Sequence, residues 1–128
     1  MNINSFQPEH KIQIKKWLKQ WNLSYAFLDM IPSTGFIIND IAALFAYETN
    51  SSVFFIEGLI SNKEIEKHIV REAIDELISH TINTMTNKGY KYAIGSSNLE
   101  TVIETVKRFE FDVNDRAYKV FSKELFNG

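Results

Sequence analysis

The chain has 128 residues, a hydrophobic fraction of 45% and a formal net charge of -2, which fits one domain with one packed core and argues against disorder. The near-neutral charge gives no sign of binding to nucleic acid or to an anionic membrane, and no apolar run approaches the ~20 residues of a membrane span. The absence of cysteine excludes disulfides and cysteine zinc sites, and the histidines have no metal-ligand spacing. We expect a cytoplasmic protein without a metal.

The N-terminal part of the chain predicts a short strand followed by a helix. Residues 2–6 have the character of a strand. Apolar residues at helical spacing then predict a helix over 8–21, in which Trp17 and Trp21 share the core face. Residues 22–33 predict a loop or one short helix whose apolar side chains reach the core.

The next part of the chain predicts an antiparallel sheet. Its β-rich runs are separated by short turns, the first of which contains the turn pair Asn39-Asp40. Such turns join neighbouring antiparallel strands. The predicted strands are 35–38, 41–48 and 53–60.

A long amphipathic helix is the clearest element of the second half. Apolar residues recur every three or four positions over 65–85, with Leu77 in the middle of the stripe. Ser61 and Glu64 predict a capping box at the start of the helix, and Gly89 predicts its end. The remaining predicted elements are a strand at 90–96, a helix at 99–109 and a strand at 117–125.

The segment Lys88-Gly89-Tyr90-Lys91 ends the long helix and leads into the next strand, which Asn98 follows. This turn, the asparagine and the order of strands and helices resemble the GNAT acetyltransferase superfamily over nearly the whole chain. The resemblance implies a single domain over 1–128 of the α/β (α+β) class, with a mixed, mostly antiparallel sheet flanked by helices on both faces. The small size and the divergent motifs resemble the short GNAT-like proteins of bacteriophages.

The resemblance also implies a site for acetyl-CoA. The family places the pantetheine arm between two parallel strands that splay apart, and Gly58 and Leu59 would lie on one of them. A glycine inside a strand often marks a bulge, and the alternative is tolerance of a small residue. Asn98 would lie on the rim of the same cleft, and the alternative is a turn residue that caps the next helix.

The family's signature for the CoA pyrophosphate is degenerate in this chain. The signature reads Gln or Arg, two residues, Gly, one residue, then Gly or Ala, and its amides face the phosphates at a helix N-terminus. Counting back from Gly89 by the usual helix length places it on residues 68–73. Of these only Ala73 fits, and Arg71 stands where a glycine would let the backbone approach a phosphate.

Two alternatives remain open for the phosphates. A helix that is continuous from Ser61 would already bond the amides near His68, so acetyl-CoA would bind weakly or not at all. The lack of any glycine or proline from 59 to 88 favours this alternative. A helix that begins near Lys67 would instead let Lys67, His68 and Arg71 hold phosphate by charge.

Glu57 is the candidate catalytic residue. The family often uses a carboxylate on this strand as the general base for an incoming amine, and the alternative is a solvated or lysine-paired strand residue. Val106 occupies the position of the family's usual acid, a tyrosine. Glu57 with Gly58 favours an acyl-CoA-dependent N-acyltransferase acting on an amine-bearing small molecule or protein, whereas the missing tyrosine favours an inactive protein. The alternative is a catalytically inactive protein that binds a host protein or a second copy of itself.

Overall fold

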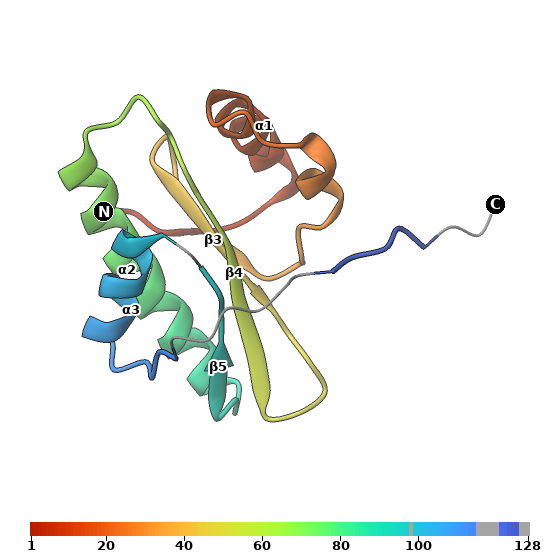
Figure 1. The fold of residues 1–128 in the computed structure, drawn as a ribbon, viewed down its shortest axis with the longest axis vertical. Helices are drawn as coiled ribbons and strands as arrows, with labels where there is room; N and C mark the ends of the chain where they lie inside the picture. The colour runs from red at the N-terminus through yellow and green to blue at the C-terminus, as the bar shows by residue number, and fades with distance from the viewer. Residues whose placement is uncertain (98, 115–120, 126–128) are drawn as a thin grey trace. The chain divides into compact units, whose positions relative to one another are not determined.

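The computed structural model describes residues 1–97, 99–114 and 121–125 (Figure 1). These residues belong to two compact units, Met1–Ser97 and Asn98–Gly128. None of the helices in the described part of the chain combines the length and the apolar character of a membrane span.

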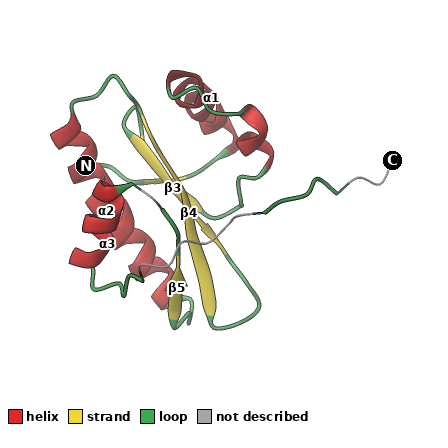
Figure 2. Cartoon of the chain, viewed as in Figure 1, coloured by secondary structure: helices red, strands yellow, loops and turns green. Residues whose placement is uncertain are grey.

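The first unit is built around a five-stranded sheet whose strands lie side by side in chain order; Figure 2 labels β3, β4 and β5 of this sheet. The first four strands are antiparallel to one another in succession, and the fifth runs parallel to the fourth. The strands are β1 (Asn4–Ser5), β2 (Gly35–Ile38), β3 (Ala42–Tyr47), β4 (Val53–Ser61) and β5 (Tyr92–Ile94). A mixed, mostly antiparallel sheet is therefore confirmed.

One face of the sheet is covered by helix α1 (Lys11–Gln20) and by a 3₁₀ helix, η2 (Tyr25–Asp29). Alternate residues of a strand point to opposite faces, and Phe45 with its neighbours on this face packs against Trp17, which is 1% exposed. The buried residues of this cluster are Phe6, Ile14, Trp17, Leu18, Ile37, Ala43, Phe45 and Ile60.

The opposite face is covered by helix α2 (Lys67–Asn87), which packs on β2 and β3 (Figure 1). Its buried residues follow the predicted stripe and include Leu77, Thr81 and Met85. The helix ends where the sequence predicts: Gly89 has φ 99°, and the amide of Tyr90 donates to the carbonyl of Met85 at 3.2 Å, as in a Schellman motif. Helices on both faces of the sheet are thus confirmed.

The start of α2 differs from the prediction. Strand β4 continues through Ser61 and the helix begins only at Lys67, so the predicted capping box is wrong. The reason is tertiary: the carbonyl of Ser61 accepts a hydrogen bond from Trp21 Nε1 at 2.8 Å, and the amide of Asn62 donates to the carbonyl of Ile41 at 2.8 Å. These bonds hold Ser61 and Asn62 outside the helix, and a turn follows in which the amide of Ile65 donates to the carbonyl of Asn62 at 3.2 Å. Trp21 makes its bond from the surface, where it is 44% exposed, and so is not the core residue expected.

The second unit contains helix α3 (Glu100–Arg108). The helix ends in a left-handed residue, Glu110 with φ 65°, where glycine is usually found. Residues 121–125 have no regular structure, and 117–120 of the predicted strand at 117–125 lie outside the described residues. The single domain over 1–128 stays a prediction.

Candidate functional site

Strands β4 and β5 pair over a short distance and then part. Their register runs from Val53 opposite Tyr92 to Phe55 opposite Ile94. Beyond this point β4 continues to its end at Ser61, while β5 is finished. Beyond the end of β5, backbone groups of β4 have no partner in a neighbouring strand on that side among the described residues. The resemblance implies such an opening for a pantetheine arm.

Strand β4 is bulged directly after the point of separation. The register with β3 shifts between the pairs Phe45–Glu57 and Ala43–Ile60, so that β4 has one extra residue there. Gly58 adopts φ 73°, which L-residues with side chains rarely take. Of the two alternatives given for Gly58, the bulge is therefore found, and Leu59, which follows it, is half-buried.

Glu57 is held at the opening by the chain that follows β5. The backbone amide and the hydroxyl of Ser96 both donate to Glu57 Oε1, each at 3.1 Å. The half-buried carboxylate is thereby fixed through one oxygen. Because Oε2 has no such bond to a described residue, it stays available to accept a proton.

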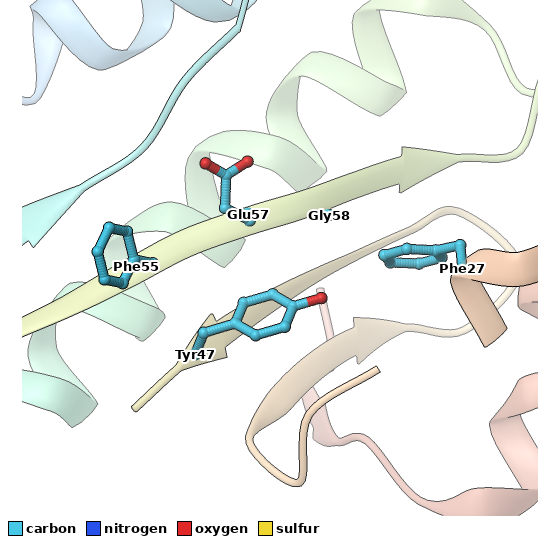
Figure 3. Close-up of a pocket in the computed structure, with 5 residues that line it drawn as sticks. All are labelled: Phe27, Tyr47, Phe55, Glu57 and Gly58. Atoms are coloured by element: carbon cyan, nitrogen blue, oxygen red, sulfur yellow. The ribbon is translucent and has the colours of Figure 1, made fainter. Parts of the chain in front are cut away.

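An open pocket of ≈ 460 Å³ lies beside Glu57, lined by Phe27, Tyr47, Phe55, Glu57 and Gly58. Figure 3 shows the segment of β4 from Phe55 to Gly58, with Phe27 of η2 near its Gly58 end and Tyr47 of β3 alongside it. The hydroxyl of Tyr47 donates to the carbonyl of Met30 at 3.0 Å. Burial, and then the negative charge of Glu57, raise the pKa of Tyr47 above its ordinary value of 10.0, so this phenol is neutral at physiological pH.

The N-terminus of α2 presents uncommitted backbone amides. The amides of Ile69 and Val70 donate to the carbonyl of Glu66, each at 3.1 Å. Those of Lys67 and His68, in the first turn, make no hydrogen bond to another described residue, as the first turn of a helix requires. Of the two alternatives for this segment, the continuous helix is wrong and a helix that begins at Lys67 is found.

The cationic side chains expected to hold phosphate are exposed at this end of α2. Lys67, His68 and Arg71 all face solvent, and His68 Nδ1 lies 3.3 Å from a carboxylate oxygen of Glu66. Ala73 is different, because it is fully buried in the core and further along the helix. The signature position assigned to residues 68–73 therefore falls inside α2 rather than at the handover from β4.

Two residues that the sequence reasoning missed fix this handover. Asn62 Oδ1 accepts from Gln20 Nε2 and from the amide of Glu64, each at 3.0 Å, and Gln20 Oε1 accepts from the amide of Lys63 at 2.9 Å. An asparagine that bonds the amide two residues on is a known turn former, so Asn62 directly after an apolar strand carried a readable signal. Gln20 carried none.

The structure does not test the two remaining candidates. Asn98 is outside the described residues, and Val106 is in the second unit. Within the described part of the chain, no group of three or more histidine, aspartate or glutamate side chains has the geometry to hold a metal ion.

Comparison with known proteins gives similarity in structure only. No protein-family model matches the sequence, and no curated protein matches it. A GNAT family acetyltransferase from Streptococcus pneumoniae TIGR4 is similar with a TM-score of 0.67 and 10% identity, over 95% of this chain and 97% of that one. The chain has the GNAT fold. The aminoglycoside N-acetyltransferase AAC(6')-Iy, solved in complex with CoA, gives a TM-score of 0.63 and 19% identity over 97% and 100% of the two chains.

A third similar structure is an aminoglycoside acetyltransferase from an uncultured soil metagenomic sample, in complex with sisomicin. Its TM-score is 0.66 at 10% identity, and the similarity covers 96% of this chain and 95% of that one. At such identities the similarity establishes the fold, and the activity has to be argued from the site itself.

Proposed function

We propose that the chain transfers an acyl group from a CoA thioester to an amine. The observation that carries the proposal is Glu57, anchored by Ser96 at the point where β4 and β5 part and bordering an open pocket. A carboxylate with one oxygen fixed and the other free is a suitable general base. Related folds that were solved with CoA and with an aminoglycoside support this reading.

The residues present fit a CoA thioester, with one departure from the family's pattern. We expect an extended pantetheine arm beside Gly58 and Leu59, where β4 continues beyond the end of β5. The amides of Lys67 and His68 at the start of α2, with the charge of Arg71, suit a pyrophosphate. The departure is the missing glycine, which keeps the backbone further from the phosphates. We therefore retain weak binding as a prediction and assign a large share of it to charge.

The thioester supplies an activated acyl group, and the chain's own residues handle the amine. Glu57 Oε2 accepts the proton that the amine loses as its nitrogen attacks, while Ser96 holds Oε1 in place. A backbone N–H of the bulge near Gly58 would polarise the acyl carbonyl, since backbone donors aimed at developing charge are a large source of catalysis. With Val106 in place of a tyrosine, water protonates the leaving thiolate.

A second candidate is a catalytically inactive GNAT fold that binds another protein, such as a phage accessory protein that binds a host protein. Val106 and the glycine-free stretch over 59–88 favour it, because each removes a part of the machinery that the resemblance implies. A protein partner or a second copy of the chain would then replace the amine as the ligand.

An acyl-transfer assay with the Glu57→Gln variant tests the proposal. The change keeps the size of the side chain and removes the base, so kcat/KM for an amine acceptor should fall by about 10²–10⁴-fold. Acetyl-CoA binding should be unchanged. Ser96→Ala removes one of the two bonds to Oε1 and should lower kcat by a smaller factor. A Glu57→Gln enzyme with the wild-type rate and pH profile would contradict the proposal, and binding without any turnover in the wild type would favour the second candidate.

A further inference from the structure

The pocket beside Glu57 combines aromatic side chains with a single charge. Of the five described residues that line it, Phe27, Tyr47 and Phe55 are aromatic and Glu57 alone is charged. The three rings come from separate elements, η2, β3 and β4. Their presence around one pocket with Glu57 is therefore a product of the fold and cannot be explained by one apolar run in the sequence.

The rings leave apolar surface open to a ligand. Phe55 is 39% exposed although it lies in a central strand. Phe27 packs edge-on against Phe45 at a centroid distance of 5.8 Å, so its ring is held in position. Rigid, partly open aromatic faces favour flat apolar bodies and also attract cations.

The charge of the pocket is suited to one ammonium group. Tyr47 is neutral and its hydroxyl is used by the carbonyl of Met30, so it offers no second negative charge. Further ammonium groups of a ligand would find no second carboxylate among the described residues that line the pocket, so they add no ion pair there. The volume of ≈ 460 Å³ lies within the range of about 300–1,000 Å³ that small-molecule sites occupy.

We infer that the acyl acceptor is a primary monoamine carried on an aromatic body, that is, an arylalkylamine. This inference rests on the proposed function. The aromatic body lies against Phe27, Tyr47 and Phe55, and the amine reaches Glu57. In the reaction a bond forms between the amine nitrogen and the acyl carbon as the carbon–sulfur bond breaks. The bound ammonium first releases one proton to water through the Glu57 carboxylate, which leaves a neutral amine to attack. The second proton that nitrogen loses passes to Glu57, and the leaving thiolate takes a proton from water.

The test is a calorimetric titration of the full chain at neutral pH, without a thioester. The probes are 2-phenylethylamine, its uncharged analogue 2-phenylethanol, and spermidine. We expect 2-phenylethylamine to bind at least about tenfold more tightly than either of the others. Glu57→Gln should remove its advantage over 2-phenylethanol. Spermidine that binds as tightly as 2-phenylethylamine, or an advantage that survives in Glu57→Gln, would overturn the inference.

A matched pair of variants on η2 tests the aromatic part. Phe27→Leu keeps an apolar side chain and removes the ring, and should weaken 2-phenylethylamine about three- to tenfold. Tyr25→Leu, two residues earlier and absent from the pocket lining, should leave the affinity unchanged within about twofold. Thermal melts check that both variants are folded. Equal effects of the two changes would overturn the inference.

A comparison of thioesters separates this inference from the proposed function. If Phe27→Leu weakens the binding of phenylacetyl-CoA but not that of 2-phenylethylamine, the aromatic rings bind the acyl group. The inference then fails while the proposed function stands. If 2-phenylethylamine binds as expected and acetyl-CoA does not bind, the proposed function fails and the assignment of the pocket to an arylalkylamine stands.

Discussion

The bulge at Gly58 joins the fold to the pocket, so its replacement by alanine is informative. A Cβ at this position would lie 2.8 Å from Phe27 Cζ and 3.0 Å from Phe45 Cδ2, with φ at +73°. Gly89 provides a matched control, because it also has a positive φ, +99°, but a Cβ there meets nothing within 4 Å. The two substitutions share the conformational penalty and differ in the steric contact.

The expected losses follow from these two terms. The left-handed conformation costs a residue with a Cβ about 1–2 kcal/mol, which sets the loss for Gly89→Ala. Gly58→Ala adds overpacking against Phe27 and Phe45, typically about 1–3 kcal/mol, for a total of about 2–5 kcal/mol. The smaller unfolded-state entropy of alanine cancels in the comparison. Urea unfolding followed by tryptophan fluorescence measures both, and a Gly58→Ala loss no larger than that of Gly89→Ala would refute the crowding described here.

Three further predictions concern stability. Leu77→Ala should lower the free energy of unfolding by about 2–5 kcal/mol, because Leu77 is fully buried. The control Ile12→Ala, at a side chain 79% exposed, should change it by less than about 0.5 kcal/mol. A Leu77→Ala loss below about 1 kcal/mol in denaturant unfolding would be inconsistent with the packing of α2. The pKa of Glu48 lies below its ordinary value of 4.5, chiefly through the hydrogen bond from Thr34. The ionised Glu48 therefore stabilises the fold above pH 4.5, and this stabilisation is lost as the pH falls through the folded-state pKa. Glu48→Gln should make the melting temperature fall less steeply at acid pH, and an equally steep fall in the variant would argue against this role of Glu48. Glu110→Gly should raise stability by up to about 1 kcal/mol by relieving the left-handed conformation, and a lower melting temperature would contradict this reasoning.

The sequence predicts the fold well where local chemistry decides it. The turn pair Asn39-Asp40 marks the end of β2, and Asp40 takes the left-handed φ of 66° that a tight turn uses. The sequence does not predict the start of α2 correctly, because Ile65 is in register with the apolar stripe although the residue precedes the helix. The bonds that hold Ser61 and Asn62 outside the helix come from Trp21 and Ile41, which are distant in sequence. No local pattern could show them.

The candidate site could be predicted in part for the same reason. Glu57 and Gly58 are visible as a carboxylate and a glycine in an apolar strand. Ser96, which anchors Glu57, comes from a loop 39 residues away, and its role depends on the parallel pairing of β4 with β5. Phe27 belongs to a segment without clear periodicity, so its place in the pocket follows only from the packing of η2 against the sheet.

The central claim, that this chain binds a CoA thioester at the parted strands and the start of α2, is tested most directly by calorimetric titration with acetyl-CoA at low and high salt. We predict saturable binding with a dissociation constant of roughly 100 μM, or about -5.5 kcal/mol. The binding should weaken as salt is raised, because exposed charges are screened. Lys67→Ala should reduce both the affinity for acetyl-CoA and its salt dependence, and the control Lys11→Ala on α1 should change neither. No binding at millimolar acetyl-CoA, or binding that neither salt nor Lys67→Ala affects, would contradict the account.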